Sequence, residues 1–295
     1  MNHHLTSLIA AGLVALPACV QAQSTGHYPV GAEGIKGPTL PPPGVYLRDY
    51  NFGYFANSAP DVALPPGAKF DAFGYVNAPR LIWMTDFKIL GANYGMDVIV
   101  PFGYREIDIG STKFTYSGLG DIQVEPLLLS WHCTRLDIGA GYAFWAPTGQ
   151  FSTSNPAKLG QGFWGHMLTL GATYYLDAEK TWAVSALNRY EFNMEQRDTH
   201  ITPGQDYTVE GGLSKSINAI KTIDAGVIGY YQQQVTHDRG TGTTNDKSRV
   251  FGVGPELSVA FPKSMLFLSL RYAREFATEY RPEGNNFVLT VTKRF

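Results

Sequence analysis

Asn285-Asn286-Phe287-Val288-Leu289-Thr290-Val291-Thr292-Lys293-Arg294-Phe295 is the stretch of sequence that decides the fold. Its apolar side chains recur with a period of two, at Phe287, Leu289, Val291 and Phe295. Such alternation predicts a β-strand with one apolar and one polar face. Soluble domains usually end in a frayed polar tail, whereas the last strand of a membrane β-barrel must pair with the first to close the sheet. The stretch therefore favours a transmembrane barrel closed by its C-terminal strand, with a soluble β-protein as the alternative.

The composition agrees with a barrel in a membrane. Charged residues make up 16% of the chain, against about 25% in an average soluble protein. The 295 residues include 32 glycines, 17 tyrosines and 17 phenylalanines, and membrane barrels use aromatic side chains in girdles at both interfaces. The net charge of −2 and the lack of any Lys/Arg cluster argue against a nucleic-acid partner.

Residues 1–22 have the pattern of a secretory signal peptide. The apolar run 5–16 is too short to span a bilayer, and Val20-Gln21-Ala22 supplies small residues for cleavage. A lipoprotein site at Cys19 is the alternative. Cleavage after residue 22 leaves Cys133 as the single cysteine, so the exported chain is expected to form no internal disulfide. After residue 22 the sequence has no continuous apolar run of about 20 residues, so it predicts no transmembrane helix.

The connections between predicted strands indicate the architecture. The segment 23–43 is rich in Gly and Pro and suits neither a helix nor a ladder strand. About twelve strands follow, at the approximate spans 45–55, 79–89, 92–104, 119–131, 135–146, 164–176, 180–193, 206–217, 221–235, 249–262, 264–276 and 286–295. Six longer connections, of which 105–118 is one, alternate with five short turns. We therefore expect an all-β, up-and-down antiparallel transmembrane barrel over 44–295, with the longer loops outside and both ends of the mature chain in the periplasm.

Most predicted strands have an apolar face and a polar face. The ionisable residues of the polar faces are expected to line the lumen: Asp49, Asp97, Glu125, Asp137, Arg189, Glu191, Glu210, Asp224, Glu256, Arg271, Glu275 and Arg294. Both charge signs are present, so these residues either pair for stability or line a water-filled path that sets selectivity. Pro101, Pro126 and Pro255 lie inside predicted strands. Each is expected to mark a bulge or bend, because proline removes a ladder hydrogen bond.

A hydrolase at the outer rim of a barrel needs a Ser or Asp beside a His. His166, His200 and His237 lie near predicted loops, and Asp238 directly follows His237. Neighbouring residues on a strand, however, point to opposite faces. The sequence contains no nucleotide-binding loop, no Gly-x-Ser-x-Gly motif and no cluster with metal-ligand spacing. We therefore expect no catalytic residue, no metal site and no cofactor.

Several short motifs together point to a family. The block His27-Tyr28-Pro29-Val30-Gly31-Ala32-Glu33-Gly34-Ile35-Lys36-Gly37 runs into Leu40-Pro41-Pro42-Pro43-Gly44 and Tyr46-Leu47-Arg48-Asp49-Tyr50. Further motifs are Gly118-Leu119-Gly120-Asp121, Pro147-Thr148-Gly149, Asn155 with Leu159-Gly160, and the Lys293-Arg294-Phe295 ending. The chain resembles the outer-membrane transporter family of the MetA pathway of phenol degradation over nearly its whole mature length. The resemblance implies passive uptake of small hydrophobic or aromatic compounds linked to their catabolism. It identifies neither the solute nor any catalytic residue.

The expected partners are outer-membrane lipid, a small hydrophobic or aromatic solute and the outer-membrane insertion machinery, whose recognition signal a terminal Phe295 on an amphipathic strand resembles. A structural or adhesive barrel with a plugged lumen is the first alternative, and an outer-membrane hydrolase is the second. The segment 23–43 is expected to be either a periplasmic tail or an arm that folds back into the lumen as a plug. In the second case Glu33 and Lys36 would pair with the charged wall, and the glycines would permit close approach.

Overall fold

The computed structural model describes residues 26–62, 64–217 and 222–295. Within them the chain forms these strands: β1 (Gly44–Ser58), β2 (Phe70–Ile89), β3 (Ala92–Ile99), β4 (Phe102–Ile109), β5 (Thr112–Leu119), β6 (Ile122–His132), β7 (Leu136–Ala146), β8 (Gly165–Tyr175), β9 (Trp182–Asn193), β10 (Asp206–Ser216), β11 (Ile223–Gln234), β12 (Arg249–Phe261), β13 (Leu266–Glu279) and β14 (Glu283–Arg294). A 3-10 turn, η1 (Pro262–Ser264), joins β12 to β13. The predicted signal peptide, the alternative site at Cys19 and the predicted turn at Asn218-Ala219-Ile220 lie outside the described residues. In the part of the chain that the structure describes, no helix is long and apolar enough to cross a membrane.

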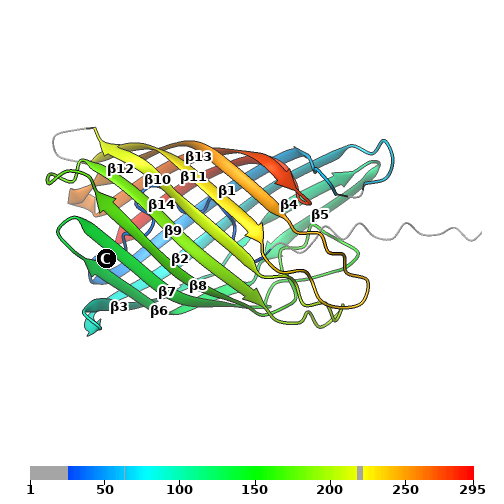
Figure 1. Ribbon diagram of the computed structural model, residues 1–295, viewed down its shortest axis with the longest axis horizontal. Coiled ribbons are helices and arrows are strands. Elements are labelled where there is room, and N and C mark those ends of the chain that lie inside the picture. The colour runs from blue at the N-terminus through cyan, green and yellow to red at the C-terminus, as the bar shows by residue number, and fades with distance from the viewer. Residues whose placement is uncertain (1–25, 63, 218–221) are drawn as a thin grey trace, which may run out of the picture.

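The sheet closes on itself into an antiparallel barrel (Figure 1). Its order is β1-β14-β13-β12-β11-β10-β9-β8-β7-β6-β3-β2, and β2 pairs back with β1. β4 continues the line of β3, and β5 continues the line of β6. The described strands therefore occupy twelve positions around the ring, which we call staves. The closure seam runs from Tyr46 opposite Arg294 to Ser58 opposite Glu283. The predicted all-β barrel of about twelve strands, closed by the C-terminal strand, is confirmed.

The two ends of the barrel differ in their connections. At the short-turn end lie the tight turn at Leu90 and Gly91, the turn after β6, the turn after β8 and η1. At the long-loop end the longer connections are 59–69, 147–164, 194–205 and 235–248. The predicted long loop 105–118 is wrong, because β4 and β5 occupy it and turn tightly at Gly110 and Ser111. Figure 1 shows this hairpin at the long-loop end of the barrel. In both strands of the hairpin apolar residues, such as Ile107 and Phe114, alternate with polar ones, which is the pattern of an antiparallel strand with two different faces.

Two of the three prolines interrupt the wall as expected. Pro101 lies between β3 and β4, where Gly120 donates its N–H to the Pro101 carbonyl at 2.9 Å. Pro126 lies where the β6–β7 register shifts. Pro255 pairs with Val227 on β11 in unbroken register. The β12–β13 ladder has no pair at Gly254 and Pro255 but keeps its register across them, so the bulge predicted there is wrong. The wall is therefore irregular from β3 to β7, whereas at Pro255 β12 loses ladder pairs to β13 without a change of register.

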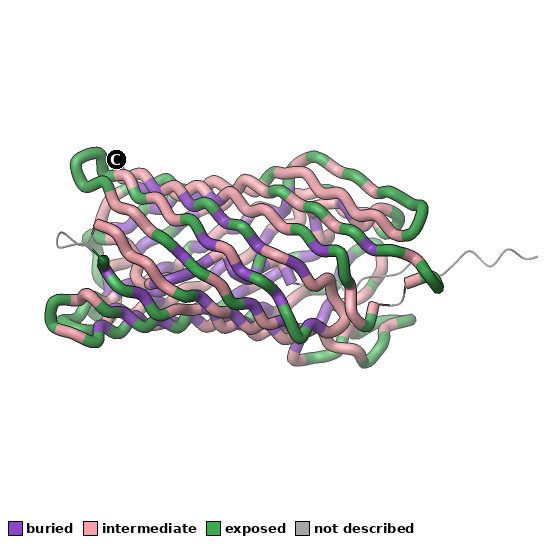
Figure 2. Tube along the Cα trace, turned by 90° about the horizontal axis from the view of Figure 1, so that it is seen from above, coloured by how far each residue is buried: buried purple, intermediate pink, exposed green. Residues whose placement is uncertain are grey.

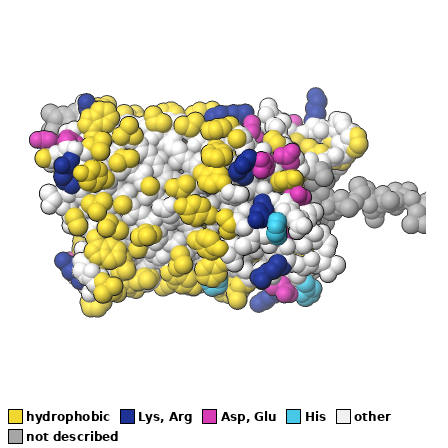
Figure 3. Space-filling model, in the orientation of Figure 1, with side chains coloured by type: hydrophobic (Ala, Val, Ile, Leu, Met, Phe, Trp, Pro, Cys, Tyr) yellow, Lys and Arg dark blue, Asp and Glu magenta, His cyan; other side chains and the backbone are white. Residues whose placement is uncertain are grey.

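The outer surface carries an apolar belt. Leucine, valine and aromatic side chains alternate outward on the staves, and Leu270 on β13 is 57% exposed. Figure 3 shows these side chains as a broad band across the middle of the molecule, with Lys, Arg, Asp and Glu gathered toward its two ends. An outward apolar band between charged rims is the arrangement that lipid requires of a β-barrel.

The interior is the reverse of a soluble core. Figure 2 marks the buried positions along the chain. They include a large set of charged and polar residues, among them Arg80, Glu210 and Glu275. Arg80, Glu210 and Glu275 each lie within 4 Å of an opposite charge, because an unpaired charge out of water is costly. The described residues of the Gly/Pro-rich segment, 26–43, also lie here, and they form the candidate site.

Candidate functional site

The segment 26–43, which we call the arm, threads the barrel from end to end. Its first residues lie at the long-loop end, where His27 contacts Glu191 near the end of β9 and Phe163 just before β8. Its last residues reach the short-turn end, where Gly44 begins β1. In between, Thr39 donates to Asp137 near the start of β7 at 3.2 Å. The expectation that the arm begins in the periplasm together with Phe295 is wrong, because Gly26 and the C-terminus lie at opposite ends of the barrel.

Three wall glutamates hold the backbone of the arm. Glu191 accepts N–H groups of His27 at 2.6 Å and Tyr28 at 3.1 Å. Glu210 on β10 accepts those of Gly31 at 3.3 Å and Glu33 at 3.0 Å. Glu256 on β12 accepts that of Ile35 at 2.8 Å. An irregular backbone in a barrel needs such partners, and hydrogen bonds to a charged acceptor are stronger than neutral ones.

Two glycines of the arm let wall glutamates lie directly against its backbone. A Cβ atom at Gly34 would lie 1.7 Å from an Oε atom of Glu256. A Cβ atom at Gly26 would lie 2.6 Å from an Oε atom of Glu191. The glycines that suggested close approach to the wall therefore lie in direct contact with wall carboxylates.

Side-chain charges of the arm join a network in the wall. Glu33 lies 3.6 Å from both Arg48 and Arg80 and accepts the Tyr50 hydroxyl at 2.6 Å. Arg80 also pairs with Asp97 at 2.5 Å and Glu125 at 2.9 Å. The guanidinium of Arg80 therefore connects the arm to two carboxylates that would otherwise repel one another at short range.

Lys36 extends the same pattern to the next part of the wall. Its Nζ lies 2.7 Å from Asp224 on β11, and its N–H donates to Ser185 at 3.2 Å. Both side chains of the ion pair are about a fifth exposed, at 23% and 20%, so this contact is weaker than the buried ones. The two arm residues that the sequence singled out, Glu33 and Lys36, thus both contact charged wall residues.

Apolar side chains of the arm fill gaps between the charged rows. Tyr28 packs with Ala143, Trp145 and Met167. Val30 and Ile35 pack in a cluster with Ile228, Tyr230, Val250 and Ala273. Leu40 packs against a cluster of Tyr46, Ile82, Met84 and Leu128. The arm is therefore held by apolar contacts on several sides of the barrel as well as by charge.

Three of the short sequence motifs meet at Asp121. Its carboxylate accepts N–H groups of Gly149 at 2.9 Å and Gln161 at 2.7 Å, which fastens the loop 147–164 to the wall between β5 and β6. The same carboxylate lies 3.3 Å from Nε2 of His27. Gly149 and Gly160 pack so closely that a Cβ atom on either would lie less than 3 Å from backbone atoms. Asp121 thus joins the interrupted wall, the outer loop and the arm.

Eleven of the twelve residues predicted to line the lumen face it. They are Asp97, Glu125, Asp137, Arg189, Glu191, Glu210, Asp224, Glu256, Arg271, Glu275 and Arg294, which are buried or contact the arm or one another. Arg271 donates to the Ala32 carbonyl, Arg294 donates to the Pro43 carbonyl at 3.0 Å, and Arg189 lies over the Tyr28 ring. The prediction for Asp49 is wrong.

Asp49 lies on the outer face of β1. It shares that face with the exposed Val45 and Leu47, whereas Tyr46 and Tyr50 are buried inside. Its carboxylate accepts amide N–H groups of Asn77 at 2.8 Å and Asn51 at 3.1 Å. The residue was assigned by its polarity rather than by its place in the alternation, and the amide pair supplies the partners that a lumen would have supplied.

Three residues of the site were not singled out by their chemistry. Arg80 shares the inward face of β2 with the apolar Ile82 and Met84, so the alternation concealed it. His27 and Asp121 were noted only within family motifs. A lone His in a Gly-rich segment, together with a Gly-Asp pair that interrupts a strand, was the available signal, but nothing in the sequence indicates that they meet.

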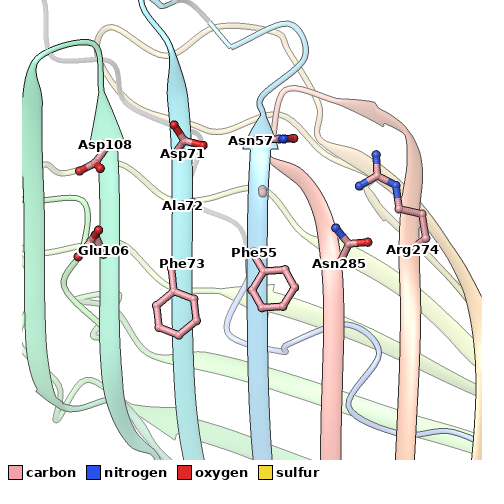
Figure 4. Close-up of a pocket in the computed structure, with 10 residues that line it drawn as sticks. Phe55, Asn57, Asp71, Ala72, Phe73, Glu106, Asp108, Arg274 and Asn285 are labelled. Atoms are coloured by element: carbon pink, nitrogen blue, oxygen red, sulfur yellow. The ribbon is translucent and has the colours of Figure 1, made fainter.

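Outside the barrel, a groove of about 440 Å³ opens near the long-loop end. Figure 4 shows Asp71 and Asp108 beside it, above the rings of Phe55 and Phe73. These two rings stack at 6.3 Å and are about two-fifths exposed. The groove therefore faces away from the lumen and does not lie on a path through it.

Two of the histidines considered for hydrolysis, His166 and His200, lie beside partners other than a Ser or Asp. His166 bonds Tyr142 at 2.9 Å and stacks on Phe192. His200 pairs with Glu195 in an exposed loop, and Asp238 accepts the Gly204 N–H at 2.7 Å. In the stretches that the structure describes, no group of three or more His, Cys, Asp and Glu could hold a metal ion.

Comparison with known proteins assigns the chain to a family. A family model described as "Putative MetA-pathway of phenol degradation" matches residues 52–291. The chain belongs to this family. No curated protein matches it by sequence.

Solved structures confirm the fold. The COG4313 outer membrane channel from Pseudomonas putida F1 superposes with a TM-score of 0.76 at 16% identity, over 91% of this chain and 99% of that one. The β domain of the Bordetella autotransporter BrkA superposes with a TM-score of 0.50 at 10% identity, over 85% of this chain and 99% of that one. With its closed sheet and apolar belt, this family member is an outer-membrane β-barrel.

Proposed function

We propose that this barrel is a channel for passive uptake of small hydrophobic or aromatic compounds linked to their catabolism, and that the arm is its constriction. The observation that carries the proposal is the arm itself. It crosses the lumen from end to end and is held by discrete contacts to Glu191, Glu210 and Glu256 rather than by strand pairing. Hydrogen bonds and ion pairs to side chains open individually, whereas a strand in the sheet opens only with the whole ladder. Family membership supports the link to catabolism.

Deleting residues 26–40 tests the proposal. The deleted barrel should show higher conductance in planar bilayers and greater leak of unrelated small solutes into liposomes. A matched control keeps the length of the arm but replaces its residues with Gly and Ser, which removes the side-chain anchors and leaves the chain in place. Unchanged conductance in a correctly folded deletion variant would contradict a role as constriction.

A structural or adhesive barrel with a plugged lumen is the second candidate. The specific observation in its favour is how completely the arm is held, with Tyr28, Val30 and Ile35 all buried. The two candidates differ in the wild-type protein. A channel swells solute-loaded liposomes at a rate that depends on the solute, whereas a plugged barrel does not swell them with any solute until the arm is removed.

We further propose that the long-loop end faces the medium and that the strand ending in Phe295 is recognised by the outer-membrane insertion machinery. An epitope inserted at Gly242, in the exposed connection after β11, should be detected on intact cells. An epitope in the β8–β9 turn, beside Lys180, should be detected only after permeabilisation. Labelling with the opposite pattern would reverse the proposed orientation.

A further inference from the structure

The imidazole ring of His27 occupies a slot in the barrel wall. It stacks on Trp145, with ring centroids 5.2 Å apart and planes 12° apart, and meets the Phe163 ring edge-on at 4.6 Å. Its Nδ1 lies 3.1 Å from Glu191, and its Nε2 lies 3.3 Å from Asp121. We call these four wall residues, Asp121, Trp145, Phe163 and Glu191, the imidazole slot.

The slot has the shape and burial of a ligand site. All four wall residues are buried, and none belongs to the arm. A Cβ atom at Gly165 would lie 2.5 Å from Nδ1 of His27, so the backbone of β8 closes tightly over the ring. A flat ring fits this space, whereas a tetrahedral or branched group of the same size would collide with the indole or with β8.

The slot is also chemically selective. A tryptophan face attracts cations, and two carboxylates on opposite edges of one ring favour two N–H donors or a positive charge. An apolar ring in the same place would offer neither carboxylate a hydrogen bond. Asp121 would keep only the N–H groups of Gly149 and Gln161, and Glu191 only the backbone N–H groups of the arm, and a missing hydrogen bond to a buried charge is costly. The present occupant is imperfectly bonded, because the buried Nε2 of His27 lies near Asp121 without a well-aligned hydrogen bond.

We propose that the imidazole slot is a binding site for a flat nitrogen aromatic compound that carries a positive charge or two N–H donors, and that His27 is its internal competitor. The inference rests on the proposed channel function and names a class of solute for it. A solute that enters the slot displaces the His27 ring. Because Glu191 also holds the N–H groups of His27 and Tyr28, the displacement weakens the anchor of the arm at the long-loop end.

The first experiment uses the full-length barrel and three small probes at about pH 6, where an imidazole is largely protonated. 4-Methylimidazole has the ring and the donors, 4-methylthiazole has the ring without an N–H, and n-butylammonium has the charge without a ring. Calorimetry in detergent should give 4-methylimidazole an affinity at least about tenfold above the other two, the loss expected for a hydrogen bond to a buried charge. It should also raise the conductance of the wild-type channel.

Variants separate the slot from general binding. His27→Ala should bind 4-methylimidazole more tightly than the wild type, because the internal competitor is gone. In that background Glu191→Gln should weaken binding about tenfold. Glu275→Gln is the matched control, since Glu275 is an equally buried wall carboxylate that pairs with Tyr54, Tyr230 and Arg281. It should leave the affinity unchanged.

Folding is checked by heat-modifiable gel migration, and Trp145→Leu replaces Glu191→Gln if that variant does not fold.

Equal affinity for 4-methylimidazole and 4-methylthiazole would overturn the proposal. So would binding to His27→Ala without binding to the wild type, which would mean that the probe only fills an engineered hole. If no solute crosses even the arm-deleted barrel while the slot still binds its probe, the channel function fails and the slot stands. If solutes cross without this preference, the slot fails and the channel function stands.

Discussion

The inner face of β10 and the outer face of β1 each hold a carboxylate, and the two are satisfied in different ways. Glu210 faces the lumen, is 2% exposed and accepts N–H groups from Gly31 and Glu33 of the arm. Asp49 faces the lipid side and accepts amide groups from Asn51 and Asn77. The inner carboxylate binds a segment distant in sequence, whereas the outer one accepts hydrogen bonds from amides on its own and the adjacent strand.

The difference shows what each face of the wall can offer. Inside, charges of both signs and an irregular backbone are available, so carboxylates build a network around the arm. Outside, only lipid and adjacent side chains are available, so a polar group must find a partner on its own or an adjacent strand. Polarity alone therefore does not reveal which face a residue occupies.

The largest expected effect comes from breaking the inner network at Arg80. Arg80→Ala leaves Asp97 and Glu125 buried together without their cation. The free energy of unfolding should fall by about 3 to 5 kcal/mol, the cost of removing one partner from a buried ion pair. Urea unfolding from lipid vesicles measures it. Arg274→Ala, which removes a half-exposed arginine paired with Glu283, is the control and should cost at most about 1 kcal/mol. Equal losses would mean that the inner network contributes no more than a surface pair.

A smaller effect is expected from placing a charge on the outer face. Leu270 pairs with Leu257 and Leu289 within the apolar belt. Leu270→Arg should reduce the stability in lipid by about 2 to 4 kcal/mol. Its neighbour Ser269 points inward and donates to Glu256 at 2.5 Å, so Ser269→Arg should cost less because a carboxylate is at hand. If both variants fold into vesicles equally poorly, the contrast between the two faces of β13 does not hold.

The smallest effect is expected at the outer polar cluster. Asn77→Leu removes the 2.8 Å hydrogen bond to Asp49 and should cost about 1 to 3 kcal/mol, the range for a hydrogen bond to a charged group and the acceptor it leaves unpaired. The double variant Asp49→Leu with Asn77→Leu should recover much of that loss, since it replaces both partners with apolar groups. A double-mutant cycle in vesicles gives the coupling. Additive losses would show that the two side chains do not act as a pair.

Much of the barrel could be predicted from local alternation. The alternation of Leu136, Ile138 and Ala140 with Asp137 correctly predicted the faces of β7, and the ending at Phe295 correctly predicted closure with β1. The stretch 105–118 was predicted as a loop although its sequence carries a hairpin signal. Ile107 and Ile109 before Gly110, and Phe114 and Tyr116 after it, alternate with polar residues. Pro255 was expected to mark a bulge or bend in β12, yet it stays paired with Val227 on β11 and interrupts only the ladder to β13, without a change of register.

The sequence by itself determined the class of fold, the number of staves and the inward placement of eleven of the twelve chosen ionisable residues. A strand has only two faces, so a period of two read along the chain already assigns each side chain to one of them. Only the tertiary structure decided that the arm threads the lumen, that Arg80 binds two carboxylates and that His27 lies between Asp121 and Glu191. The partners of His27 lie more than 90 positions away in the sequence, and those of Arg80 lie on two other strands of the sheet. No local pattern records which segments a closed sheet brings together.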